Sequence, residues 1–298
     1  MQPINICIIF LFTYISIATC EDAFAKIGNL SIKYGNQTEI HFAIKDSNGM
    51  TLQAQLEALK LEQRSLFAEL TSKLDKFIAD NWLPSQFPND CAKATAVSRS
   101  SGVYQIVIPD YSIHPFLVRC DEHTQNGGWT VILNREDGSV NFFRYWKDYK
   151  NGFGNVNGEF FIGLEKLHLL TKEMDQELLI VMEDFQRKQK YAKYNLFVVG
   201  NEDNLYALQE LGEYSGDAGD SLTGHLGQYF SARDRDNDKY EKNCAEIYTG
   251  GWWYSKCHSS NLMGKYNDTT HGKGINWLLF SGHTASLKSV QMMIRPVT

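Results

Sequence analysis

The sequence from Arg233 to His258 reads RDRDNDKYEKNCAEIYTGGWWYSKCH, and it decides how the rest of the chain is interpreted. It combines aspartates at alternate positions, two cysteines, and a run of aromatic residues followed by a histidine. Carboxylate oxygens suit a hard cation, and two nearby cysteines suit a short disulfide loop. We interpret the stretch as a calcium-supported recognition site with a polar-aromatic surface.

The acidic run places Asp234, Asp236 and Asp238 two residues apart. In an extended or looping backbone their carboxylates converge and repel one another unless a cation lies between them. An EF-hand is excluded, because its sixth position would be Lys239 instead of Gly and its twelfth Ala245 instead of Glu. The alternative is a solvated acidic loop balanced by its basic neighbours, namely Arg233, Arg235 and Lys239.

The whole chain has 298 residues, of which 43% are hydrophobic and 21% charged, with a net charge of −6. That length is sufficient for one sizeable core with accessory segments. The mild acidity and the lack of a basic cluster in the sequence argue against nucleic acid as a partner.

The first 20 residues contain no charged side chain, and an apolar run extends from Ile4 to Ile17. This pattern predicts a secretory signal peptide at residues 1–20 and a secreted, extracellular protein; the alternative is an uncleaved signal anchor. The run is short for a membrane span, which needs about 20 apolar residues. Cleavage after Cys20 would remove Cys7 as well and leave four cysteines in an oxidising compartment.

Four cysteines allow three pairings. Closure of local loops favours Cys91–Cys120 and Cys244–Cys257. A disulfide that closes about a dozen residues contributes roughly 3 kcal/mol in the chain-entropy description. The second pair would therefore fix one wall of the recognition site.

The segments before the cysteine-containing region divide into three. Residues 21–47 have no clear period but carry two N-glycosylation sequons, at Asn29 and Asn36; a third lies at Asn267. Residues 48–80 repeat apolar side chains in about four heptads and predict a short coiled coil that makes homo-oligomers. The alternative is one amphipathic helix that packs on its own domain. Residues 81–89, with two prolines, form the predicted linker.

From Asp90 to Thr298 the chain resembles the fibrinogen C-terminal domain, which is the globular domain of fibrinogen chains, ficolins, tachylectins and angiopoietins. The motifs that carry the resemblance are Asp236-Asn237-Asp238-Lys239, Asn243-Cys244-Ala245-Glu246, Gly250-Gly251-Trp252-Trp253-Tyr254, Cys257-His258, Tyr214 to Leu222, and Asn261 to Tyr266. The resemblance implies an α+β fold with a mixed or antiparallel sheet, short helices and long loops. It also implies the two local disulfides. The sequence further predicts a turn followed by a strand within 101–106, strands at 116–121, 177–184 and 193–199, and a helix at 164–171.

The resemblance implies a Ca²⁺ site as well. Its ligands would be the side chains of Asp236 and Asp238 and the backbone carbonyls of Tyr240 and Lys242. It also implies a cis peptide bond at Asn243–Cys244, which would aim backbone N–H groups at an acetyl carbonyl.

In the lectin branch of this family, an aromatic cage with a histidine binds acetyl groups. Tyr248 and His258 match two cage positions, and His271 and His283 align with two cage tyrosines. Imidazole becomes charged near pH 6.5, so binding is predicted to change between about pH 7.5 and 5.5. A zinc site formed by the three histidines is an alternative.

An esterase is the other chemical alternative, because Gly219-Asp220-Ser221-Leu222 and Asp268-Thr269-Thr270-His271 contain a serine, an aspartate and a histidine. These motifs resemble those of GDSL-type esterases, in which the serine follows the first strand of the domain. Ser221 instead lies far along the domain, which argues against an esterase. We therefore predict a non-enzymatic, secreted, lectin-like protein that binds glycans or acetylated groups on cell or microbial surfaces, as in innate immunity. The main alternative is a protein ligand that docks a receptor.

Overall fold

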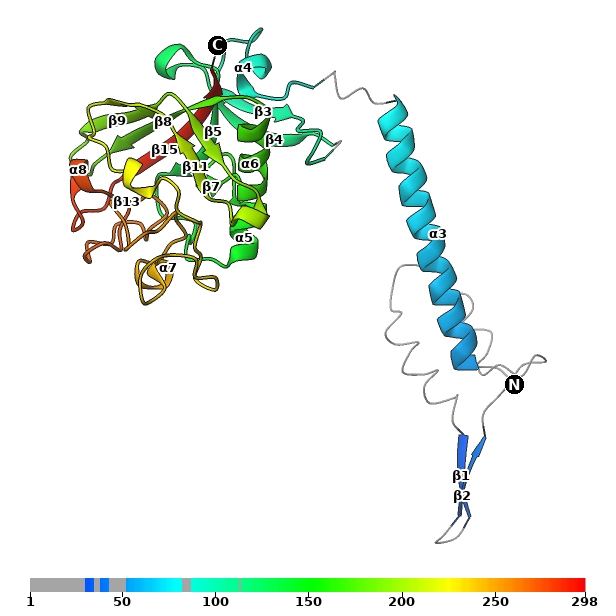
Figure 1. The fold of residues 1–298 in the computed structure, drawn as a ribbon. Helices are drawn as coiled ribbons and strands as arrows, with labels where there is room; N and C mark the ends of the chain where they lie inside the picture. Colours follow the sequence, from blue (N-terminus) through cyan, green and yellow to red (C-terminus); the bar gives the residue numbers. More distant parts are fainter. Residues whose placement is uncertain (1–29, 35–37, 43–51, 82–86, 113, 298) are drawn as a thin grey trace. The chain divides into compact units, whose positions relative to one another are not determined.

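The computed structural model describes residues 30–34, 38–42, 52–81, 87–112 and 114–297 (Figure 1). The chain separates into two compact units, Met1–Asn81 and Trp82–Thr298. The predicted signal peptide and the sequons at Asn29 and Asn36 lie outside the described residues. Within those ranges, no helix has the length and apolar character that a membrane crossing requires.

The first unit contains a β-hairpin that the sequence analysis did not predict. Strand β1 (Leu30–Tyr34) pairs antiparallel with β2 (Thr38–Phe42), and Ile32 lies opposite Ile40. The signal was present, because apolar residues alternate with polar ones along both segments.

The long helix α3 (Leu52–Asn81) confirms the helix predicted at 48–80, of which residues 48–51 are outside the described part. The two heptad positions carry Leu56, Gln63, Leu70 and Phe77, and Leu52, Leu59, Leu66 and Lys73. Leu59, Leu66, Leu70 and Phe77 each expose at least 60% of their surface. This helix therefore presents an apolar stripe to solvent within its own unit, and the coiled coil remains a prediction.

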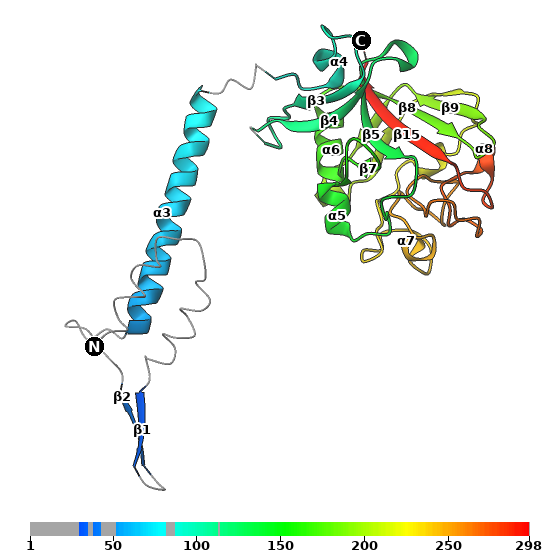
Figure 2. The same cartoon turned by 180° about the vertical axis from the view of Figure 1, so that it is seen from behind.

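The second unit is built on one antiparallel sheet in the order β12-β9-β8-β15-β5-β4-β3, with β6 and β7 beside β5 (Figures 1 and 2). The last strand of the chain lies in the middle of this sheet, between β8 and β5. The strands are β3 (Gly102–Ile106), β4 (Phe116–Asp121), β5 (Trp129–Arg135), β6 (Phe153–Gly154), β7 (Phe160–Phe161), β8 (Gln176–Glu183), β9 (Gln189–Tyr194), β12 (Tyr214–Gly216) and β15 (Ser289–Pro296).

Strand β5 is buried along its whole length, because other parts of the domain cover both of its faces. Its partner β15 buries Val290, Met292, Met293 and Ile294. The α+β fold, the strands at 102–106 and 116–121 and the helix at 164–171 are confirmed. The strand predicted at 193–199 was wrong as one element. The chain ends β9 at Tyr194 and turns before β10 (Phe197–Val199), which pairs with β11 (Leu208–Leu211).

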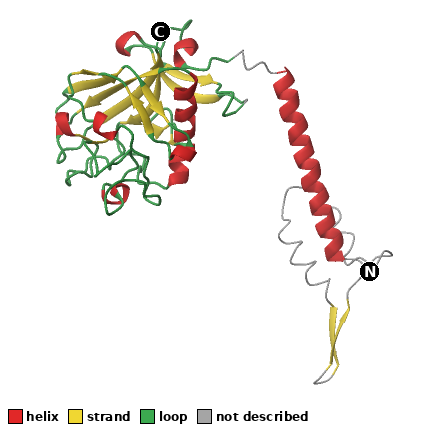
Figure 3. Cartoon of the chain, viewed as in Figure 1, coloured by secondary structure: helices red, strands yellow, loops and turns green. Residues whose placement is uncertain are grey.

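Short helices and loops complete the unit (Figure 3). The remaining elements are α4 (Cys91–Ala94), η3 (Thr124–Asn126), α5 (Trp146–Asn151), α6 (Leu164–Glu173), η4 (Glu202–Asn204), η5 (Thr223–His225), α7 (Cys244–Ile247), β13 (Ser260–Asn261), β14 (Asn276–Trp277) and α8 (Leu278–Ser281). Between β12 and β15 the regular elements are only two to four residues long, so side-chain hydrogen bonds and a disulfide must hold this region.

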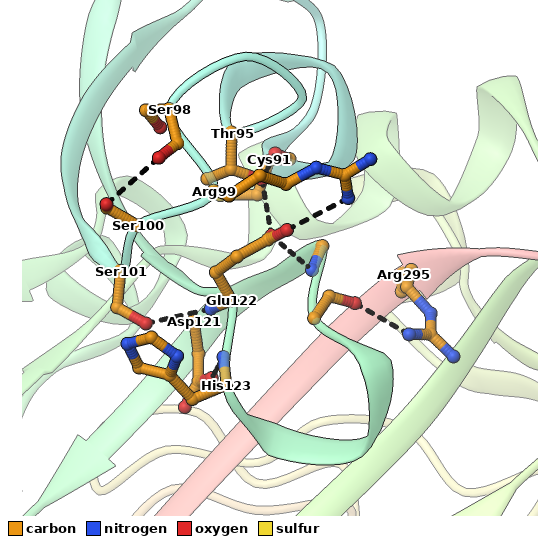
Figure 4. A network of polar contacts seen from close by, with 12 residues as sticks. Cys91, Thr95, Ser98, Arg99, Ser100, Ser101, Asp121, Glu122, His123 and Arg295 are labelled. Atoms are coloured by element: carbon orange, nitrogen blue, oxygen red, sulfur yellow. Dashed lines mark hydrogen bonds and ion pairs between the residues drawn. The ribbon is translucent and has the colours of Figure 1, made fainter.

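The disulfide Cys91–Cys120 joins α4 to β4, as predicted. Beside it, Glu122 accepts hydrogen bonds from Thr95 Oγ1 at 2.6 Å and from the Gly128 amide at 2.9 Å, and it pairs with Arg99 (Figure 4). These donors, of which Thr95 is the strongest, lower the pKa of Glu122. The network fixes the start of the domain to the edge of the sheet.

A buried ion pair connects the sheet to the loop region. Arg135, at the end of β5, lies 3.3 Å from Glu159 and donates to the carbonyls of Leu262 and Gly264 at 3.1 and 2.9 Å. Its guanidinium also stacks 3.8 Å from the ring centre of Phe142. One side chain therefore ties the turn directly after β13 to strand β5.

Candidate functional site

The structure separates the three aspartates that the sequence treated as one run. Asp234 accepts a hydrogen bond from the Trp146 amide at 2.7 Å, at the first residue of helix α5. Asp236 and Asp238 remain together in the following loop, where the Asp238 amide donates to Asp236 Oδ1 at 3.2 Å. The basic neighbours are also engaged elsewhere, since Arg235 stacks on Trp146. The acidic loop is therefore not balanced by Arg235.

Asp238 is the centre of this loop. Its two carboxylate oxygens accept the amides of Tyr240 and Cys244, each at 2.8 Å. Desolvation raises the pKa of Asp238, and the neighbouring charge of Asp236 raises it further, although the two amides oppose the shift. A cation beside the two carboxylates would relieve both effects.

The residues of this loop fit a Ca²⁺ ion, because an ion there would offset the desolvation and the repulsion that raise the pKa of Asp238. Two adjacent carboxylates supply anionic oxygens, and among the described residues no hydrogen bond ends on the carbonyl of Tyr240 or of Lys242. Calcium accepts a mixture of carboxylate and carbonyl oxygens. The four predicted residues would therefore hold the ion, which would brace this loop and supply positive charge beside it.

The expected cis bond at Asn243–Cys244 is a wrong prediction. The cis peptide within the described ranges is Lys256–Cys257. Asn243 instead caps helix α7, with its side-chain oxygen accepting the amides of Ala245 and Glu246. The Cys244 amide is bonded to Asp238, so it is not free to meet an acetyl carbonyl.

The second disulfide, Cys244–Cys257, forms as predicted and closes the loop between α7 and His258. The aromatic run inside it is buried, however, and the predicted polar-aromatic surface was wrong. Trp252, Trp253 and Tyr254 have no exposed surface and pack in the hydrophobic core. The large rings pack in the core because burial removes their apolar surface from water, and a β-bridge between Trp252 and Ser231 holds the segment there.

The predicted cage residues do come together. The ring centres of Tyr248 and His258 lie 4.6 Å apart, those of His258 and His283 5.0 Å, and those of His283 and His271 5.1 Å. Gly272 lies against this row, since its amide donates to the His283 carbonyl at 2.7 Å. We call Tyr248, His258, His271 and His283 the histidine row. Tyr248 is the C-cap of α7, so the row begins where α7 ends, and this short helix separates it from the calcium loop.

The protonation of His258 follows from its partner. Nε2 lies 3.1 Å from the Gly272 carbonyl, which can only accept, so Nε2 carries the proton and Nδ1 is an acceptor. Nδ1 is buried and, among the described residues, has no hydrogen-bond partner; the same holds for His283 Nδ1. Burial, aided by the other histidines, lowers the pKa of His258 to about 3.

The pKa of His283 is also lowered, first by desolvation and then by His271. Both rings are therefore neutral at physiological pH. The change in ligand binding that was predicted between about pH 7.5 and 5.5 is therefore expected at more acidic pH for His258 and His283.

His225 was missed by the sequence analysis. It is 1% exposed, and Nδ1 donates to the Trp253 carbonyl at 2.7 Å while Nε2 accepts the amides of Ser259 and Ser260. It thus positions the segment that follows His258. A single histidine in an irregular stretch carries no period or spacing, so sequence reasoning had no signal for it.

Two chemical alternatives are not supported. No group of three or more His, Cys, Asp or Glu side chains in the described ranges is arranged to hold a metal, so the structure gives no support to the zinc site. Ser221 is 2% exposed and accepts the Leu279 amide, while Asp268 accepts the Thr270 amide. In the described structure no hydrogen bond links Ser221, His271 and Asp268, so the esterase triad is not assembled. Asn267, the third sequon, is exposed.

Comparison with known families identifies the class of domain to which this chain belongs. The family profile described as fibrinogen beta and gamma chains, C-terminal globular domain, matches residues 87–297. The chain belongs to this family, whose domain is a non-enzymatic recognition module.

Curated relatives include tenascin-R of Gallus gallus, 45% identical over 210 residues, which are 70% of this chain and 15% of that protein. Fibrinogen C domain-containing protein 1 of Homo sapiens is 45% identical over 207 residues, covering 67% of this chain and 44% of that protein. The chain thus spans less than half the length of these two relatives.

Solved structures of fibrinogen-like proteins also match the fold of this chain. The fibrinogen-like globe domain of human ANGPTL6 is 42% identical with a TM-score of 0.68, covering 71% of this chain and 96% of that chain. The lamprey fibrin D-dimer, in complex with the peptide Gly-His-Arg-Pro-amide, is 33% identical with a TM-score of 0.65, covering 82% and 88%.

Proposed function

We propose that the chain is a secreted recognition protein whose fibrinogen-like domain binds glycans or acetylated surface groups at the histidine row, with Ca²⁺ bracing the adjacent loop. The observation that carries the proposal is the buried Nδ1 of His258 beside Tyr248, which has no hydrogen-bond partner in the part of the chain that the structure describes. A buried acceptor without a partner costs about 1–3 kcal/mol, which a ligand N–H or O–H would recover. An acetamido group offers one N–H donor and a methyl group that packs on an aromatic face.

The calcium loop is connected to the histidine row through helix α7. Asp238 accepts the Cys244 amide, Cys244 begins α7, and Tyr248 is the C-cap that follows the last residue of α7. An ion at Asp236 and Asp238 would therefore stabilise the first residue of the histidine row, although it lies in a separate loop.

The test uses the secreted protein on immobilised N-acetylglucosamine at neutral pH. Retention that both a calcium chelator and free acetylated sugar release would support the proposal. The decisive variant is His258→Phe, which keeps a ring against Tyr248 but removes the acceptor. Arg187→Gln, in an exposed turn remote in sequence, is the control. Absence of retention by folded, calcium-loaded protein would contradict acetyl-group binding.

A protein receptor is the second candidate, and one observation favours it. Helix α8 buries none of its residues, and Leu278 and Leu279, which precede His283 by five and four residues in the chain, expose 40% and 59% of their surface. The Leu278 amide donates a hydrogen bond of 2.9 Å to the carbonyl of Ser259, the residue after His258 of the histidine row. An apolar rim suits a protein surface better than a sugar. Capture of a protein ligand that Leu279→Ser weakens and free sugar does not displace would establish this alternative.

The exposed apolar stripe of α3 supports homo-oligomers. A coiled coil would bury Leu59, Leu66 and Leu70 against a second copy and leave Gln63 as a polar exception. Linking several domains can strengthen weak binding by roughly 10²–10⁴ without new contacts.

A further inference from the structure

Two arginines lie on an aromatic platform that the proposed site does not use. The platform consists of Phe143, Tyr145 and Trp146, the last of which begins helix α5. The guanidinium of Arg233 lies 4.3 Å from the ring centre of Phe143 and 4.7 Å from that of Tyr145. The guanidinium of Arg235 lies 4.1 Å from the ring of Trp146.

A tight turn fixes both arginines. Ala232 and Arg235 exchange backbone hydrogen bonds of 2.9 and 3.0 Å, so Arg233 and Asp234 form the two-residue tip. Asn243 Nδ2 holds this turn from one side by donating to the Ala232 carbonyl at 3.0 Å. Asp234 holds it from the other through the Trp146 amide. The side chains are therefore positioned before any ligand arrives.

The two arginines differ in how their charge is satisfied. Arg235 lies 3.9 Å from Glu202, a carboxylate that also binds Lys150 and the Trp146 indole. For Arg233, within the described ranges, no ion pair and no side-chain hydrogen bond is formed. Stacking on a ring occupies the face of a guanidinium and leaves its N–H edge free.

We propose that this arginine–aromatic surface, formed by Arg233 and Arg235 on Phe143, Tyr145 and Trp146, binds the sulfate groups of an acidic glycan. A planar guanidinium with a free edge matches a sulfate or carboxylate oxygen pair in bidentate geometry. The exposed ring of Tyr145 offers a flat surface to a sugar ring. A repeating anion, as in a sulfated glycan, would engage both arginines in sequence, whereas an isolated carboxylate would engage one.

The test measures binding of the full secreted chain to a heparin octasaccharide by titration calorimetry at low ionic strength. Arg233→Gln should weaken binding about tenfold, because one charge-assisted bidentate contact is lost. Arg233→Lys keeps the charge but not the planar fork and should also weaken binding. Arg187→Gln removes an equal charge from an exposed turn and should leave affinity unchanged.

Three results would overturn the inference: equal affinity of Arg233→Gln and wild type, an equal loss in Arg187→Gln, or equally tight binding of a desulfated octasaccharide or polyglutamate. Retention of each variant on N-acetylglucosamine is measured in parallel. Because Arg233 is not part of the histidine row, loss of one binding activity without the other distinguishes failure of this inference from failure of the proposed function.

Discussion

Acidification should destabilise the fibrinogen-like domain through two buried histidines. The pKa is about 4 for His225 and about 3 for His258, against 6.5 for an ordinary imidazole. Both pKa values are lowered in the folded state, so their stability contribution is complete above pH 6.5 and is lost as pH falls toward 4. At about pH 5 each ring is neutral when folded and charged when unfolded, which costs roughly 2 kcal/mol per histidine.

The assay is urea unfolding at about pH 7.5, 6 and 5 with the disulfides intact and calcium held constant. The wild type should lose roughly 4 kcal/mol across this range from these two groups. His225→Gln can still donate to the Trp253 carbonyl and accept the Ser259 amide, but it does not titrate. It should show about half the pH dependence.

An unchanged pH dependence in His225→Gln would refute the reasoning. Direct titration of the imidazole signals by NMR provides a second check on the wild type. A pKa of His225 near its ordinary value would contradict the prediction even if the variant failed to fold.

Three further predictions concern the calcium loop, the buried ion pair and the helix. Calcium should raise the melting temperature most near neutral pH and less in acid, because the pKa of Asp238 is raised and protons compete with the ion. Asp238→Asn should remove this effect of calcium on the melting temperature. Persistence of the effect in that variant would contradict the site. Arg135→Met should destabilise by about 3–5 kcal/mol in urea unfolding, because Glu159 would be left buried without its cation; a loss below about 1 kcal/mol would contradict this. Leu70→Glu should lower the oligomer mass in sedimentation, whereas Ser72→Glu, outside the two heptad positions, should not; equal masses would exclude the coiled coil.

Much of the fold was readable from sequence because its signals are local. The heptads of α3, the strands at 102–106 and 116–121, and the two short disulfide loops each depend on residues close together in the chain. The order of motifs across residues 90–298 then identified the domain, so its fold followed from the family.

The tertiary structure decided what spacing leaves open. Alternating aspartates look equivalent in sequence, yet Asp234 caps a helix about 90 residues away in the chain while Asp236 and Asp238 stay together. The aromatic run after Cys244 looks like a surface but is core, because burial removes its apolar surface from water and a bridge to Ser231 holds it there. Partners distant in the chain settle such questions, and a pattern within one stretch contains no information about them.

The sequence alone therefore determined the class of domain, the local disulfides and the residues that could form a cage. Only the tertiary structure showed that the pKa values of His258 and His283 are lowered, that His225 supports the segment after His258, and that Arg233 is held on two rings. The physical reason is that charge state and orientation depend on desolvation and on contacts from every side, which chain folding alone creates.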